Sequence, residues 1–170
     1  MPLSIYDFSI ENFIRGLTAL SQILEKGKAH AEAKKVDFSV MLQTRLIPDQ
    51  FPLGKQIQIA TDIAKLFVPR ISSIQGPSFP DTETTYEEFQ ERIQKTIDFL
   101  KTISPNDIAP EGKKVSFPWN PGYSLDGEEY AAHYAIPNFY FHVTTAYAIL
   151  RASGVALGKS DYLTGLKWMS

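Results

Sequence analysis

Three polar side chains share one face of a segment that is otherwise apolar: Asn138, His142 and Thr145. Their spacings of four and three residues place them together if the segment is helical. Residues 137–150 carry no formal charge and present apolar or aromatic groups in nearly every direction, so we expect this helix to be buried on most sides. A buried imidazole or amide without a partner costs about 1–3 kcal/mol. The three side chains are therefore expected to meet polar groups of another helix, water or a ligand.

Gln58 and Asp62 are candidate partners because they lie four residues apart beside an apolar stripe of an earlier predicted helix. In the functional interpretation, Asp62 faces His142 across a bundle, and Asn138 and Gln58 complete a polar pocket. In the structural interpretation, Gln58 and Asp62 point to water, and His142 bonds to a carboxylate or backbone group. The sequence leaves both open.

A metal site is a weaker possibility. His142, Asp62 and Asn138 are the candidate ligands, whereas bundle-core sites usually assemble three or more histidines or carboxylates. His133 lies nine residues before His142 and could cover the mouth of a bundle, so it is a further candidate for the pocket. His30 falls among charges at the end of the first helix and is expected to be solvated. The sequence contains no cysteine, which excludes thiolate ligands, disulfides and a cysteine nucleophile.

Several other functions find no support in the sequence. Gly158-Lys159-Ser160 lacks the first glycine of a phosphate loop and a preceding strand. A net charge of −2 gives no indication of a nucleic-acid partner. The first residues do not form a signal peptide, and the most apolar stretch, 131–150, contains Pro137, Asn138 and His142, so we expect a core helix rather than a membrane span. We therefore expect a cytoplasmic protein that binds neither nucleic acid nor membrane.

The chain of 170 residues predicts one domain, residues 1–170. Apolar periodicity predicts four helices, at about residues 4–33, 55–74, 85–102 and 137–153. Alternating residues from Val115 to Trp119, followed by the turn Asn120-Pro121-Gly122, predict a short hairpin or ordered loop before the last long helix. The predicted fold class is all-α: a four-helix up-down bundle with a crossover.

Two runs of sequence carry a family resemblance. One extends from Ile136 to Arg151 and continues through Gly154-Val155 and Gly158-Lys159-x-Asp161-Tyr162-Leu163. The other is Arg45-Leu46-x-Pro48-Asp49, followed by Gln56-x-Gln58 and Asp62. Together they resemble an uncharacterised bacterial domain family grouped with the DinB/YfiT-like proteins, over nearly the whole chain.

The resemblance implies a four-helix bundle with a long first crossover, and it makes a homodimer plausible. Relatives often bind a divalent metal such as Zn, Ni or Fe through three histidines, one on the second helix and two in a His-x-x-x-His pair on a later helix. Here the pair is Asn138-x-x-x-His142, and the second helix offers Gln58 or Asp62. Three functions follow as hypotheses: a protein that binds a small molecule in a polar pocket, a metal-dependent enzyme related to thiol S-transferases, or a structural, oligomeric protein.

Overall fold

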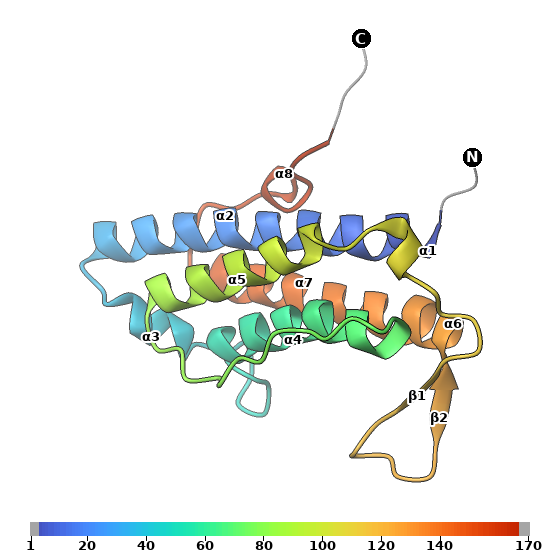
Figure 1. The fold of residues 1–170 in the computed structure, drawn as a ribbon. Helices are drawn as coiled ribbons and strands as arrows, with labels where there is room; N and C mark the ends of the chain where they lie inside the picture. The colour runs from blue at the N-terminus through green and yellow to red at the C-terminus, as the bar shows by residue number, and fades with distance from the viewer. Residues whose placement is uncertain (1–3, 167–170) are drawn as a thin grey trace.

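Four long helices lie side by side in the computed structural model, which describes residues 4–166 (Figure 1). They are α2 (Ile10–Lys34), α4 (Leu53–Ile71), α5 (Tyr86–Lys101) and α7 (Ile136–Ala152). Helix α2 packs against α5 and α7, and α4 packs against the same two helices. The predicted four-helix bundle is therefore confirmed, and its helix boundaries lie within about three residues of those expected except at the start of α2.

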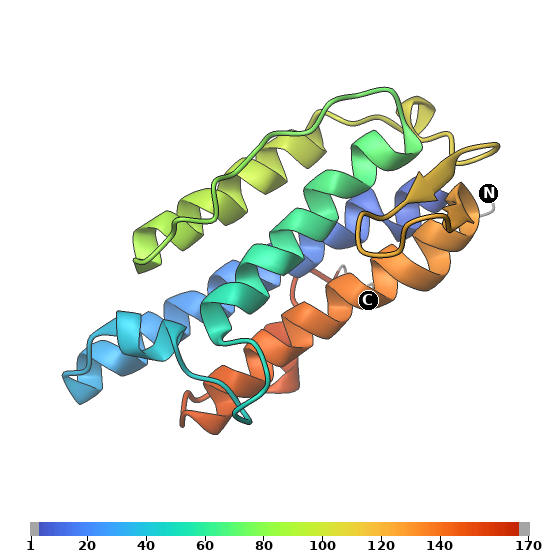
Figure 2. The ribbon, with the colours of Figure 1, turned by 90° about the horizontal axis from the view of Figure 1, so that it is seen from below.

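The crossover lies between α4 and α5, where residues 72–85 carry the chain back along the bundle without regular structure (Figures 1 and 2). Helices α4 and α5 therefore run in the same direction. The first connection, residues 35–52, stays at one end of the bundle and holds the short helix α3 (Phe38–Leu42). The expectation of a long first crossover was wrong, because the connection that spans the bundle is the second.

Local sequence explains where two helices begin. Ser4 and Asp7 form a capping box at α1 (Ile5–Phe8), and Thr85 and Glu88 form one at α5. The predicted first helix is interrupted at Ser9, whose hydroxyl donates to the Ile5 carbonyl at 2.6 Å, so that α1 and α2 are separate helices.

The predicted hairpin is present as β1 (Lys114–Ser116) and β2 (Ser124–Asp126), with Val115 opposite Leu125. Helix α6 (Gly127–Glu129) and a π-helical stretch (Tyr130–Ala135) then lead without a break into α7. Pro137 has no N–H to donate to the His133 carbonyl, which accounts for the wider π-helical turn before it.

The remaining elements are a 3₁₀ turn (Pro105–Asp107) and the short helix α8 (Lys159–Tyr162). Gly154 ends α7 with φ of 92°, as expected for a glycine just past a helix C-terminus. Within residues 4–166, no helix is long and apolar enough to span a membrane.

Aromatic rings from three helices form the centre of the core. Phe13 of α2 contacts Phe67 of α4 and Phe139 of α7, with ring centroids 5.2 Å and 4.8 Å apart. Gly16 lets α2 approach α7, because a Cβ there would lie 2.5 Å from a ring carbon of Phe139. The same α4–α7 packing positions the polar pair described next.

Candidate functional site

His142 bonds to an amide on α4. Its Nδ1 lies 2.7 Å from Oε1 of Gln56, and both side chains are buried, with 8% and 1% of their surface exposed. The prediction that His142 looks inward and meets a polar atom of another helix is confirmed. Asp62, the expected partner, makes its polar contacts elsewhere.

The Gln56 amide fixes the position of the imidazole proton. Its Nε2 donates to the Phe51 carbonyl at 2.9 Å, which leaves Oε1 facing His142. A flipped amide would bring two oxygens together. Because Oε1 can only accept, Nδ1 of His142 must carry the proton, and in the neutral ring Nε2 is then a bare acceptor. Burial lowers the pKa of His142 to about 4, so the ring is neutral at pH 7.

Two largely exposed aromatic residues flank the His142–Gln56 pair. The ring of Phe141 meets that of His142 edge-on, with centroids 5.1 Å apart and 57% of Phe141 exposed. Phe51, whose carbonyl holds Gln56, is 56% exposed. Asn138 and Thr145 continue the same face of α7, where Asn138 is half-buried and the Thr145 hydroxyl donates to the Phe141 carbonyl.

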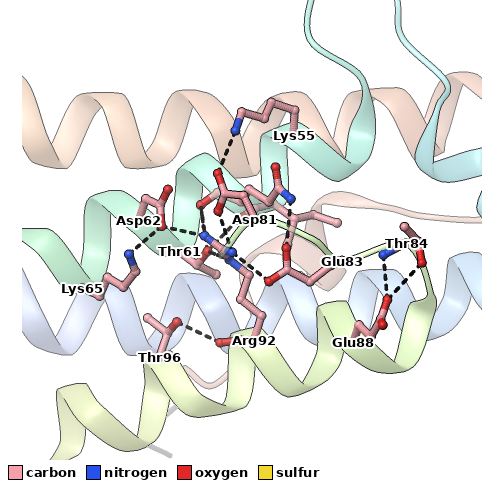
Figure 3. A network of polar contacts seen from close by, with 12 residues as sticks. Lys55, Thr61, Asp62, Lys65, Asp81, Glu83, Thr84, Glu88, Arg92 and Thr96 are labelled. Carbon is pink, nitrogen blue, oxygen red and sulfur yellow. Dashed lines mark hydrogen bonds and ion pairs between the residues drawn. The ribbon is translucent and has the colours of Figure 1, made fainter. Parts of the chain in front are cut away.

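Gln58 and Asp62 belong to a different network, centred on Arg92 of α5 (Figure 3). Asp62 Oδ1 lies 2.6 Å from Nη2 of Arg92 and 2.8 Å from Nζ of Lys65, and Gln58 donates to Glu83. The proposed pocket joining Asp62 and Gln58 to His142 was therefore wrong. These two side chains lie on the face of α4 that meets α5, whereas Gln56 lies on the face that meets α7.

The Arg92 guanidinium is buried, with 2% of the residue exposed, and all its N–H-bearing nitrogens have acceptors. Nε donates to the Thr61 hydroxyl, Nη1 to Asp81 and Glu83, and Nη2 to Asp62 and the Gln58 carbonyl. Asp81 and Glu83 come from the crossover, and Phe79 of the same segment stacks on both Arg92 and Lys65 at 5.0 Å. The network thus attaches the crossover to α4 and α5.

Two acidic members of the network, Asp81 and Glu83, have pKa values below their usual range. Burial acts to raise the pKa of Asp81, but the hydrogen bond from Lys55 and the charge of Arg92 outweigh it and hold the pKa below its usual value. Burial opposes ionisation of Glu83 in the same way, and hydrogen bonds from Arg92 and Gln58 lower its pKa. With every donor of Arg92 used inside the protein, this network is a structural clamp.

The other two histidines lie apart from this pair. His133 is exposed in the π-helical stretch, near the hairpin end of α7. His30 is half-buried near the end of α2, where its ring approaches Gly154, so it is less exposed than a freely solvated side chain.

The residues around His142 do not fit a Zn, Ni or Fe site. Only one imidazole is present, its neighbour Gln56 is an amide already bonded to Nδ1–H, and Asn138 offers a second amide. Amides are poor ligands for these metals compared with imidazole or thiolate. No group of three or more His, Asp or Glu side chains arranged to hold a metal occurs among residues 4–166.

Neither Gln56 nor Arg92, the central residues of these two networks, was assigned to a site from the sequence, although Gln56 lies in a run that carries the family resemblance. Gln56 lies four and seven residues before Ala60 and Ile63, on a buried face of α4. Arg92 lies between Phe89 and Ile93 on the apolar stripe of α5, where a charge must find partners. For both residues, the position of a polar side chain within an apolar helix face could have indicated a buried polar contact.

The fold places the protein in the class of DinB-like helical bundles. The structure is similar to the crystal structure of a DinB family member protein from Shewanella denitrificans, with a TM-score of 0.92 and 42% sequence identity. The match covers 97% of this chain and 94% of that one.

A family model described as a domain of unknown function (DUF1993) matches residues 5–163. The chain therefore belongs to the DUF1993 family. Comparison with curated proteins gives no match. The resemblance seen in the sequence is thus confirmed at the level of the family.

Proposed function

We propose that the protein binds a small organic molecule at His142, and that the ligand donates a hydrogen bond to Nε2. The observation that carries this proposal is the fixed, neutral tautomer: Gln56 holds the proton on Nδ1 and leaves Nε2 with a free lone pair. The exposed ring of Phe141 beside the pair provides apolar contact surface.

The low pKa of His142 supports a binding role over an acid–base role. A group with a pKa of about 4 holds no proton to give at pH 7 and is a weak base, because proton transfer is most effective near the working pH. A neutral acceptor at this position suits an amide, hydroxyl or amine donor on the ligand.

The test is a thermal-shift screen of neutral and cationic small molecules with N–H or O–H donors. Compounds that bind should raise the melting temperature of the native protein but not that of the His142→Phe variant, which keeps the ring volume and removes the acceptor. The control is His133→Phe, because His133 is exposed and outside the pair. Hits that stabilise both variants equally would contradict the proposal.

The metal-dependent alternative has a separate test. Protein purified without a polyhistidine tag should contain far fewer than one zinc, nickel or iron ion per chain, because His142 is the one imidazole in the pair. Stoichiometric metal that His142→Phe loses would instead favour an enzyme of the thiol-transferase type.

A homodimer is a second candidate property, supported by exposed apolar side chains on α7 and the first connection. Ile47 and Phe51 of the first connection and Phe141 of α7 are each more than half exposed. Exposed apolar side chains of this kind are typical of interaction surfaces. We propose that a second copy of the chain covers them.

We also propose that the protein works in the cytoplasm.

A further inference from the structure

A cavity of about 370 Å³ lies at the end of the bundle opposite the hairpin, where α2 and α7 end beside α3 (Figure 1). It shares no lining residue with the His142–Gln56 pair or the Arg92 network. Ligand pockets commonly measure about 300–1,000 Å³, so its volume suits a small organic molecule.

The floor of this cavity is apolar. Ala31 and Met41 are almost fully buried and contribute side-chain surface, and Val36 forms an exposed edge. Methionine adapts its shape to irregular apolar ligands because its side chain is unbranched and flexible. The floor therefore suits an aliphatic body.

Lys34 makes the charge of the lining positive. His30 and Lys34 line the cavity, and no acidic residue does. Among residues 4–166, Lys34 has no ion pair. The nearest acids in the sequence are engaged elsewhere: Glu32 lies 3.8 Å from Lys28, and Asp37 accepts from the Ser39 N–H at the start of α3.

The remaining polar groups at this end already donate to backbone carbonyls and are not available to bind an anion. The hydroxyls of Thr44 and Ser153, just past the ends of α3 and α7, donate to the Val40 and Ile149 carbonyls in the last turns of those helices. At the end of α2, N–H groups of residues 35 and 36 cap the carbonyls of Glu32 and Ala31. Lys34 and His30 are thus the groups available to a ligand head.

We infer that this end cavity binds a small amphiphilic carboxylate, with its carboxylate at Lys34 and its aliphatic body on Met41 and Ala31. An amine head would meet Lys34 with like charge, and an alcohol would lack the charge-assisted hydrogen bond that a carboxylate forms. The attraction weakens with added salt, because Lys34 is exposed.

Octanoate is the probe, and calorimetric titration against octanol and octylamine is the experiment. Octanoate should bind saturably and at least tenfold more tightly than either analogue. Lys34→Glu should weaken octanoate binding at least tenfold. Lys101→Glu makes the same change in net charge at the end of α5, outside the cavity, and should leave binding unchanged.

Location is tested with protein labelled on its methionine methyl groups. Octanoate should shift the NMR signal assigned to Met41, and Val36→Asp should abolish the shift, since it places an acid at the exposed edge of the cavity. His142→Phe should bind octanoate normally, which separates this site from the one at His142. Equal binding of octanol and octanoate, normal binding by Lys34→Glu, or an unmoved Met41 signal would each overturn the inference.

Discussion

At the scale of single residues, His142 makes the stability of the protein depend on pH. Its pKa is about 4 in the folded protein, against an ordinary 6.5. Between these values the unfolded chain takes up a proton that the native state does not. The free energy of unfolding therefore falls as pH falls through this window, by up to about 3 kcal/mol in total.

Urea unfolding between pH 5 and 7 measures this effect, since Asp81 and Glu83, whose pKa values are lowered, lose their contribution only at more acid pH. His142→Gln should flatten the pH dependence in this range, whereas His133→Gln should retain it. An unchanged slope in His142→Gln would contradict the burial of the neutral ring.

Single residues also mark where prediction from sequence succeeded and where it failed. The apolar surroundings of His142 indicated burial and a polar partner, because these follow from local composition. The choice of Gln56 over Asp62 could not be predicted, since the two lie six residues apart on α4 and face different helices. Only the packing angle and the rotation of α4 decide which of them meets α7.

At the scale of elements, Arg92 determines how the crossover is held. Arg92→Ala would leave Asp62, Asp81 and Glu83 beside each other without their shared cation. Breaking a buried ion pair in this way typically costs about 3–5 kcal/mol. We expect a loss of that size in urea unfolding, together with faster amide hydrogen exchange in residues 72–85.

The matched control lies one turn along the same helix. Lys95 pairs with Glu91 in an exposed i, i+4 bridge, and Lys95→Ala should cost less than about 0.5 kcal/mol. Arg92→Lys should stay well below the native stability, because one ammonium cannot replace the five N–H donors of the guanidinium. Equal stability of Arg92→Lys and the native protein would show that charge alone suffices.

The contact between α2 and α7 gives a second prediction for elements. Gly16→Ala should destabilise the protein although alanine is the better helix former by about 1 kcal/mol, because the added Cβ meets the Phe139 ring at 2.5 Å. Phe139→Leu removes the ring that causes the clash. In a double-mutant cycle, Gly16→Ala should therefore cost less in the Phe139→Leu background than in the native one.

The four long helices and the hairpin could be predicted because periodicity, capping boxes and turn residues are local signals. The direction of the crossover could not. Residues 72–85 carry little apolar periodicity, and their position depends on Asp81 and Glu83 reaching an arginine on the next helix.

At the scale of the whole molecule, the exposed apolar side chains predict self-association. Sedimentation equilibrium should give the mass of a dimer at micromolar concentration, and Phe141→Glu should shift it toward the 19.1 kDa chain, because a buried charge at an interface is costly. Trp119→Glu is the control, since Trp119 is exposed on the hairpin rather than on α7 or the first connection. A native protein that sediments as a monomer would contradict this prediction.

The protonation state and tautomer of the His142 ring are central, and nitrogen-15 NMR of the labelled imidazole measures both directly. We predict a neutral ring at pH 7 with the proton on Nδ1, and a titration midpoint near pH 4. A midpoint near pH 6.5 would contradict the burial of the neutral ring, and a proton on Nε2 would remove the bare acceptor on which the proposed ligand binding depends.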